Sequence, residues 1–177
     1  MEKNNNVVAI KMLSNKYKKL PYRLNVGLMI VNHDKKVFCG QRLDNNNQAW
    51  QMPQGGIDEG ETPINAAYRE LYEETGIKKE KVEKIATSKV WINYDLPQEL
   101  IPRLWGGKFR GQKQKWFLFK FNGLDADIDI NTEHKEFSNW CWMRPSSLMD
   151  SIVPFKQEVY KKVLNEFYNK MGTEDTN

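Results

Sequence analysis

The chain has 177 residues, a formal net charge of +4, and 40% hydrophobic and 28% charged residues. These values are typical of one globular domain with its own core, and they exclude a disordered or low-complexity chain. There is no apolar run of the ~20 residues that span a bilayer and no secretory apolar region at the N-terminus, so we expect a cytoplasmic protein without a membrane anchor. Cys39 and Cys141 have neither metal-ligand nor disulfide-framework spacing, which predicts reduced, part-buried thiols.

Residues 1–20 mix asparagine, lysine and a short apolar piece, which predicts a mobile or loosely docked N-terminal extension before a domain over 21–170. The apolar run Asn25–Val31 predicts a buried strand, and a polar turn joins it to a second strand over 37–42 in a hairpin. Pro53 predicts a strand end or edge at 50–53.

A helix is expected to begin at Thr62 and Pro63, because threonine caps free N–H groups and proline suits the first helical position. Gly76 provides a left-handed stop, so the helix should end near Thr75.

On this helix one arc is mostly apolar, and Glu70, Glu73 and Glu74 fall together on the opposite arc. Like charges at this spacing destabilise a solvated helix, and no lysine is placed to neutralise them. A hard divalent cation such as Mg²⁺, which prefers carboxylate and phosphate oxygens, is the physical candidate for their partner. The alternative is a solvated acidic helix face.

The C-terminal half predicts one or two strands over 82–94, a long loop over 98–111, a strand over 112–121 and another over 137–143. Helices should follow at 145–151 and from 154 to about 168, and the tail 171–177 should be disordered. Between 101 and 120 the chain is basic and has no acid: Arg103, Lys108, Arg110, Lys113, Lys115 and Lys120. An acidic metal site beside such a basic wall suits a polyanionic substrate.

The spacing from Gly55 to Ile77 resembles the Nudix box at every fixed position. The matching residues are Gly55, Glu61, Arg69, Glu70, Glu73, Glu74 and Gly76. The resemblance implies a hydrolase of pyrophosphate linkages in which Glu70, Glu73 and Glu74 bind Mg²⁺ or Mn²⁺ and Arg69 orients a carboxylate. It also implies an α+β fold, an α/β/α sandwich with a mixed central sheet.

Further segments resemble the bacterial RNA pyrophosphohydrolases, among them Tyr22–Arg23, Asn25–Gly27, Trp50–Gly56, Tyr94–Pro97, Gly111–Phe117 and Val153–Lys156. That branch implies conversion of 5′-triphosphate RNA ends to monophosphate with release of pyrophosphate, which promotes RNA decay. A related reading is hydrolysis of dinucleoside polyphosphates such as diadenosine tetra- or pentaphosphate. A reading from another class is a non-catalytic module that binds nucleotides or RNA ends.

Arginines near strand ends suit bidentate phosphate binding, and lysines act as point charges. The substrate-binding candidates are Arg23, Arg42, Lys113, Lys115, Phe155 and Lys156. Surface ion pairs or a solvated strand face are alternatives for the cations, and a core position is the alternative for Phe155. The catalytic candidates are Glu74, Glu73, Glu136 and Arg69, and the sequence does not rank Glu136 against a box glutamate as the general base.

Overall fold

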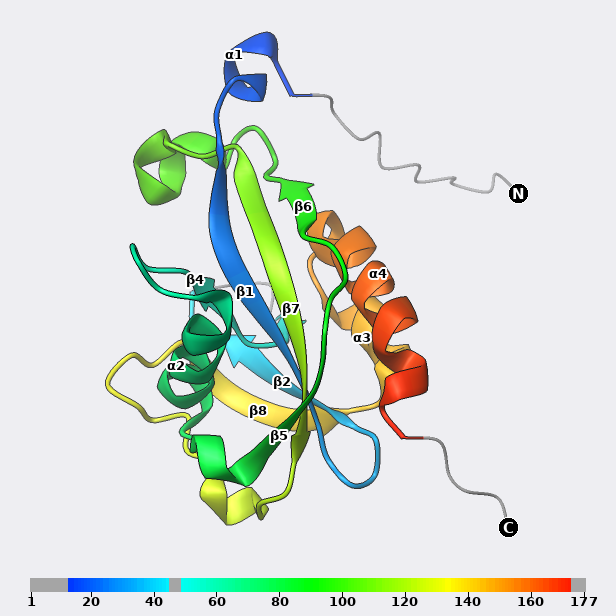
Figure 1. Ribbon diagram of the computed structural model, residues 1–177. Coiled ribbons are helices and arrows are strands. Elements are labelled where there is room, and N and C mark those ends of the chain that lie inside the picture. The colour runs from blue at the N-terminus through cyan, green and yellow to red at the C-terminus, as the bar shows by residue number, and fades with distance from the viewer. Residues whose placement is uncertain (1–12, 45–48, 173–177) are drawn as a thin grey trace, which may run out of the picture.

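The computed structural model describes residues 13–44 and 49–172. Within these residues one mixed sheet of eight strands lies between helices on its two faces (Figure 1). The strands are β1 Tyr22–Val31, β2 Val37–Arg42, β3 Trp50–Gln51, β4 Gln54–Gly56, β5 Val82–Thr87, β6 Ile92–Asp95, β7 Gly111–Phe121 and β8 Phe137–Met143. The helices are α1 Asn15–Lys18, α2 Pro63–Thr75, α3 Pro145–Ser151 and α4 Gln157–Phe167. The α/β/α sandwich predicted from the sequence is confirmed.

Short 3₁₀ turns occupy several connections. They are Lys79–Lys81, Ile101–Arg103, Trp105–Gly107, Asp125–Asp127, Pro154–Lys156 and Tyr168–Lys170. The segment expected as one helix from 154 is therefore a 3₁₀ turn that leads into α4. No helix in the described residues combines the length and apolarity needed to cross a bilayer.

The long strands β1 and β7 run parallel, paired from Tyr22 with Gly111 to Val31 with Lys120. Strand β2, in contrast, meets β1 only where Val31 faces Val37. The predicted hairpin is therefore wrong beyond its turn, because β4 takes the edge of β1 and β2 pairs with β3 and β8 instead. The sheet opens between these two branches, and the opening is where the site forms.

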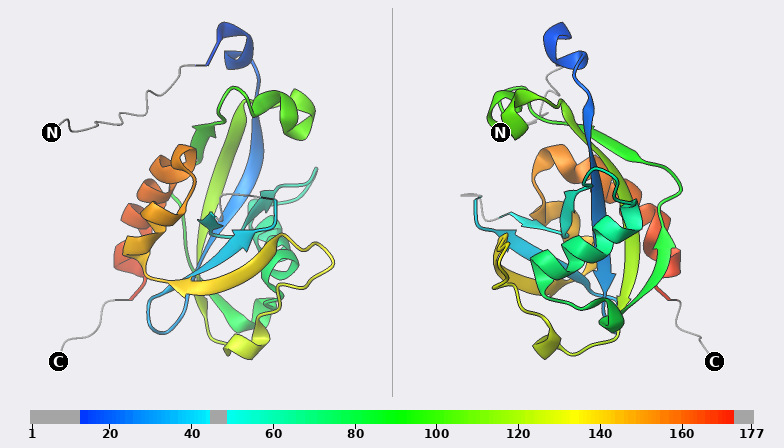
Figure 2. Two further views of the ribbon diagram at one scale, coloured as in Figure 1. Left: turned by 180° about the vertical axis from the view of Figure 1, so that it is seen from behind. Right: turned by 60° about the vertical axis from the view of Figure 1, so that its left-hand side comes forward.

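Two apolar layers hold the sheet, one on each face. On one face Val26, Leu28 and Ile30 of β1 pack with residues of α2. On the other face Met29 packs in the same cluster as Tyr160 of α4. Strand alternation explains this division, since successive side chains point to opposite faces. Figure 2 shows α2 and the α3–α4 pair on opposite sides of the sheet.

From residue 13 onward, the segment before β1 packs against the domain. Leu13 is buried, and Tyr17 packs against the cluster that includes α4. The guanidinium of Arg110 also donates to the carbonyl of Lys18 at 2.9 Å. Residues 1–12 and 173–177, where the rest of the extension and most of the predicted disordered tail fall, lie outside the described residues.

The two cysteines are free thiols on facing positions of β2 and β8, with Cys39 fully buried and Cys141 half-buried.

Candidate active site

A cavity of about 640 Å³ lies where the two branches of the sheet diverge. Acidic, cationic and aromatic side chains line it together. The acids are Glu70, Glu73, Glu74, Asp44 and Glu136, the cations are Arg23, Arg42 and Lys156, and the aromatic residues are Tyr94, Trp105 and Phe155. The three glutamates predicted to bind metal, Glu70, Glu73 and Glu74, and four of the six predicted substrate-binding residues therefore meet in one place.

Local signals at both ends of α2 fix the glutamates in this cavity. The hydroxyl of Thr62 accepts the N–H of Asn65 at 3.4 Å, and Pro63 is the first helical residue. Gly76 has φ of 68°, and a Cβ there would lie 2.6 Å from the carbonyl oxygen of Asp129. The helix begins and ends as predicted, because these residues satisfy its free backbone groups and allow its left-handed stop.

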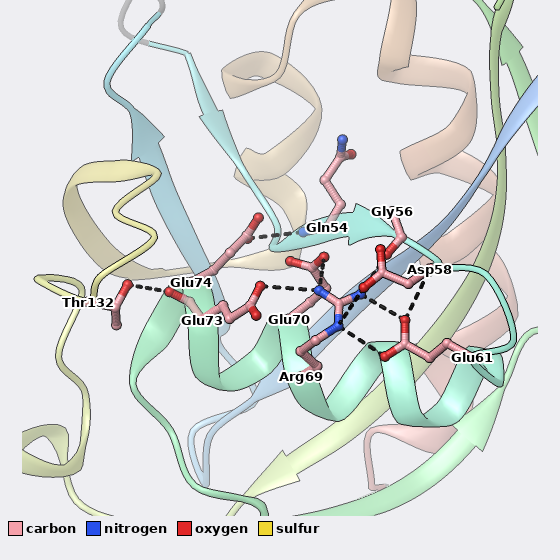
Figure 3. Close-up of polar contacts among 9 residues, drawn as sticks. All are labelled: Gln54, Gly56, Asp58, Glu61, Arg69, Glu70, Glu73, Glu74 and Thr132. Atoms are coloured by element: carbon pink, nitrogen blue, oxygen red, sulfur yellow. Dashed lines mark hydrogen bonds and ion pairs between the residues drawn. The ribbon is translucent and has the colours of Figure 1, made fainter. Parts of the chain in front are cut away.

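Arg69 is the centre of a hydrogen-bond network around the box (Figure 3). Its Nε and Nη2 donate to the two carboxylate oxygens of Glu61 at 3.0 and 2.9 Å, and Nη2 also donates to the carbonyl of Gly56 at 2.8 Å. Its Nη1 donates to Glu70 at 2.8 Å and to Glu73 at 3.1 Å. Glu70 and Glu73 thus have Arg69 as a cationic partner on their own helix, and its guanidinium holds the orientation of three carboxylates, those of Glu61, Glu70 and Glu73.

Glu74 and Glu70 are buried against β4 rather than presented to solvent, with side chains of low exposure. Glu74 is 4% exposed, and its Oε2 accepts the N–H of Gln54 at 3.1 Å. Burial raises the pKa of Glu74 well above its usual value, and the charges of Glu70 and Glu136 raise it further. Burial also raises the pKa of Glu70, against the lowering effect of Arg69. The surroundings of both carboxylates therefore neutralise their negative charge only in part, so each favours binding a proton or a cation.

These oxygens suit a hard divalent cation in their chemistry. The described residues contain no ready-made cluster of three acidic, histidine or cysteine side chains around one point, and the carboxylates of Glu70 and Glu73 both accept hydrogen bonds from Arg69. Gly55 leaves room beside the carboxylate of Glu70, since a Cβ there would lie 1.8 Å from the carboxyl carbon. Buried carboxylates that repel one another fit Mg²⁺ or Mn²⁺, which take oxygen ligands and neutralise charge.

The cavity cations are held by different elements. Arg42, at the end of β2, donates to the two oxygens of Asp44 at 2.6 and 2.5 Å and lies 3.9 Å from the carboxylate of Glu136. Arg23 of β1 has its guanidinium 5.4 Å from the centre of the Trp105 ring. The two sheet branches therefore each bring one arginine to the cavity.

Lys156 is the most buried of these cations, 7% exposed in the turn before α4. Its Nζ donates to the amide oxygens of Gln51 and Gln54, both at 3.3 Å. Burial first, and the charge of Arg42 second, lower the pKa of Lys156 to about 7. An anionic ligand beside this ammonium would favour its charged form.

Several lining residues had no role assigned from the sequence. Tyr94 packs against Phe155 with ring centres 5.9 Å apart. Asn25 accepts a hydrogen bond from Gln114 at 3.1 Å, and its buried amide nitrogen has no partner among the described residues. Both residues lie in segments that carry the family resemblance, but nothing in their spacing marks them as ligands. Glu136 lies at the cavity rim just before β8, with its side chain 49% exposed, and His134 lies at the same rim.

Lys113 and Lys115 lie outside the cavity. Side chains alternate along β7, so Gln112 points toward the site and the two lysines point to the other face of the sheet. The basic wall expected from residues 101–120 does not form either. None of its six cations lines the cavity, and Arg110 instead forms an ion pair with Asp95 at 2.7 Å. The density of basic residues along the sequence did not predict a basic wall correctly, because strand alternation and the path of the loop place these side chains on different sides of the domain.

A model of the NUDIX domain matches residues 21–163, and the chain belongs to this family. A splayed mixed sheet, the box helix and the arginine-centred carboxylate network accordingly define a Nudix hydrolase. Within the family, the chain is 55% identical over 149 residues to the RNA pyrophosphohydrolase of Roseobacter denitrificans, covering 84% of this chain and 93% of that protein. It is 52% identical over 158 residues to the enzyme of the same name from Rickettsia typhi, covering 89% and 97%. The predicted resemblance to the bacterial RNA pyrophosphohydrolases is confirmed.

Solved structures share the fold at lower identity. An Ap4A hydrolase from C. elegans superposes with a TM-score of 0.60 at 22% identity, over 82% of this chain and 98% of that one. The dihydroneopterin triphosphate pyrophosphohydrolase of E. coli gives 0.63 at 20% identity, over 82% and 99%. These likenesses support the architecture.

Proposed function

We propose that this protein is an RNA 5′ pyrophosphohydrolase of the cytoplasm that converts 5′-triphosphate ends to monophosphate ends and releases pyrophosphate. The observation that carries the proposal is the cavity itself, where buried carboxylates of α2 face Arg23, Arg42 and Lys156. A polyphosphate is the ligand that both halves of such a cavity can bind, through the cations directly and through a shared divalent ion. The identity to proteins named RNA pyrophosphohydrolase supports RNA as its carrier.

Each cation has a separate task in binding. Arg23 and Arg42 lie on different branches of the sheet and can hold phosphates from two sides, with bidentate geometry that orients the chain of phosphates. The buried Lys156 lies between Gln51 and Gln54 and adds a fixed point charge. Phosphoryl transfer depends mainly on such positioning and on electrostatic stabilisation.

Glu70, Glu73 and Glu74 would hold Mg²⁺ or Mn²⁺, with Arg69 fixing the orientation of Glu70 and Glu73 and the N–H of Gln54 that of Glu74. When bound, the cation supplies positive charge that stabilises the charge developing on the phosphate oxygens. Glu136 faces the cavity from its rim and is the carboxylate we assign to take the proton from the attacking water. Glu74 is the competing candidate for that proton, and the two are separated by comparing Glu136→Gln with Glu74→Gln. Loss of a base lowers kcat by about 10²- to 10⁴-fold without changing the metal requirement, whereas loss of a ligand also raises that requirement.

The decisive assay uses RNA labelled at the γ-phosphate of its 5′ end, incubated with Mg²⁺ or with a chelator. We expect label in pyrophosphate with Mg²⁺ and none with the chelator. Glu73→Gln should abolish release, whereas Glu80→Gln, which changes an exposed acid in the turn after α2, should not. Label released as orthophosphate, or equal release by the Glu73 variant, would contradict the proposal.

Diadenosine tetraphosphate would use the same cations and glutamates, so it serves as the competing substrate. We expect kcat/KM to be higher for triphosphate RNA than for the dinucleotide when both are present. Turnover of the dinucleotide with no product from RNA would assign the protein to dinucleoside polyphosphate hydrolysis. Metal-independent RNA binding without any cleavage would assign it to the non-catalytic class.

A further inference from the structure

Beyond the reach of α2, the described part of the sheet has a face with no helix packed on it, formed by the first halves of β1 and β7 together with β6 (Figure 1). Helix α2 packs on β1 from Val26 onward, whereas Leu24 is 49% exposed. In one row across this face Lys113 lies between Leu24 and Asn93. Lys115 follows two residues later, next to Trp91, which immediately precedes β6. We call Leu24, Trp91, Asn93, Lys113 and Lys115 the lysine–tryptophan face.

The charge of this face is positive. The Nζ atoms of Lys113 and Lys115 lie 5.9 and 6.0 Å from the centre of the half-buried Trp91 ring. The neighbouring acids already have partners. Asp95 is paired with Arg110, and Glu166 accepts the backbone N–H of Lys89 at 2.6 Å. An indole beside two ammonium groups on flexible stems is the combination that binds single-stranded nucleic acid, where a base stacks on the ring and lysines contact phosphates.

The face and the cavity are two sides of the same strands. On β1, Arg23 and Asn25 line the cavity, and Leu24 between them belongs to the other face. On β7, Gln112 lines the cavity, and Lys113 points away from it. On β6, the outer strand beside β7 at this end of the described sheet, Tyr94 lines the cavity and Asn93 belongs to the other face. A polynucleotide whose 5′ phosphates occupy the cavity would therefore reach the lysine–tryptophan face by passing around β6.

We propose that the RNA chain beyond its first nucleotides binds to the lysine–tryptophan face, with Trp91 stacking on a base and Lys113 and Lys115 contacting phosphates. This inference rests on the RNA activity proposed above. Lys113 and Lys115, which lie outside the cavity, would then contact a long RNA but not a short substrate. Contacts of this kind do not read sequence, because every base offers a ring face and every nucleotide a phosphate.

The experiment compares Lys113→Gln/Lys115→Gln with the wild type on two substrates. One is a triphosphorylated single-stranded RNA of about 20 nucleotides, longer than the ~4–16 nucleotides that one single-strand-binding domain contacts, and the other is a triphosphorylated dinucleotide. We expect kcat/KM to fall about tenfold on the long RNA at low salt and to stay unchanged on the dinucleotide. The slope of log kcat/KM against log salt should decrease by roughly 1.4, about 0.7 for each lost phosphate contact.

Two further variants make the test specific. Lys84→Gln/Lys120→Gln removes two exposed lysines from the same sheet and should leave kcat/KM on both substrates and the salt slope unchanged. Trp91→Phe keeps an aromatic ring and should retain more long-RNA activity than Trp91→Ala, because stacking needs only a ring face.

Equal losses on the long and short substrates, or no loss on either, would overturn the inference, and a selective loss supports it. Loss of binding to a protein while long-RNA kinetics stay unchanged would also overturn it and assign the face to a protein partner. If the wild type releases no pyrophosphate from either RNA, the proposed function itself fails. This outcome differs from wild-type cleavage that is indifferent to the two lysines.

Discussion

Replacing Arg69 by alanine tests whether its guanidinium holds the box carboxylates in place. The side chain donates hydrogen bonds to Glu61, Glu70 and Glu73 and to the carbonyl of Gly56, all between 2.8 and 3.1 Å. A hydrogen bond to a charged group contributes about 1.5–3 kcal/mol when buried. Arg69 is 28% exposed, so solvent screens part of each contribution. We therefore expect a total loss of about 3 kcal/mol in the free energy of unfolding.

For a domain of this size, 1 kcal/mol shifts Tm by roughly 2–4 °C, so Arg69→Ala should lower Tm by about 6–12 °C. The measurement is thermal unfolding at neutral pH with a chelator present, because a bound divalent cation would neutralise the same carboxylates. Arg103→Ala, in an exposed turn, is the matched control and should stay within about 0.5 kcal/mol of the wild type.

Arg69→Lys keeps the positive charge but loses the two-pronged contact with Glu61, so its Tm should fall between those of the alanine variant and the wild type. A Tm for Arg69→Ala within about 2 °C of the wild type would refute the reasoning, because the network would then contribute no net stability. A large loss that is the same for alanine and lysine would show that shape, rather than charge, is what Arg69 provides.

Three further predictions concern the cavity. Glu74→Gln should lower kcat at least about 10²-fold while Tm stays the same or rises, because removing a buried charge relieves its desolvation; a parallel fall in Tm would contradict this. Gly55→Ala should lower kcat/KM by about 10²-fold, because its Cβ would displace the Glu70 carboxylate; unchanged kinetics would show that this carboxylate is not needed in place. The folded-state pKa of Lys156 is about 7, below its unfolded value of about 10.4. From pH 7 to pH 9, the free energy of unfolding of the wild type should therefore rise by about 2 kcal/mol more than that of Lys156→Met, as measured by denaturant unfolding. An equal rise in both proteins would refute the lowered pKa.

The box helix could be predicted from the sequence because its determinants are local. Thr62, Pro63 and Gly76 act on neighbouring backbone groups, and the spacing of the glutamates fixes their face of the helix. What the helix face meets was not predictable in the same way. The burial of Glu70 and Glu74 depends on β4, which pairs with a strand about 30 residues earlier in the chain.

The cations show the same limit. Arg23 and Arg42 reach the cavity as the family resemblance implied, whereas Lys113 and Lys115 do not, although all four are basic residues on strands. The difference lies in which face of its strand each residue occupies, and that assignment depends on pairing across the sheet. Tyr94 and Trp105 were missed for a related reason, since Tyr94 of β6 meets Phe155 and Trp105 meets Arg23, and both contacts join segments distant in the chain.

The single pair of facing residues between β1 and β2 has a consequence for how this enzyme tolerates change. Because β1 and β2 face each other directly only at Val31 and Val37, the separation of Arg23 from Arg42 depends on the core packing beneath the opening. Substitutions at buried positions under the opening should therefore change the affinity for the phosphate chain before they unfold the domain. Evolution or engineering could widen or narrow this cavity through substitutions in the protein core, without changing any residue that contacts the substrate.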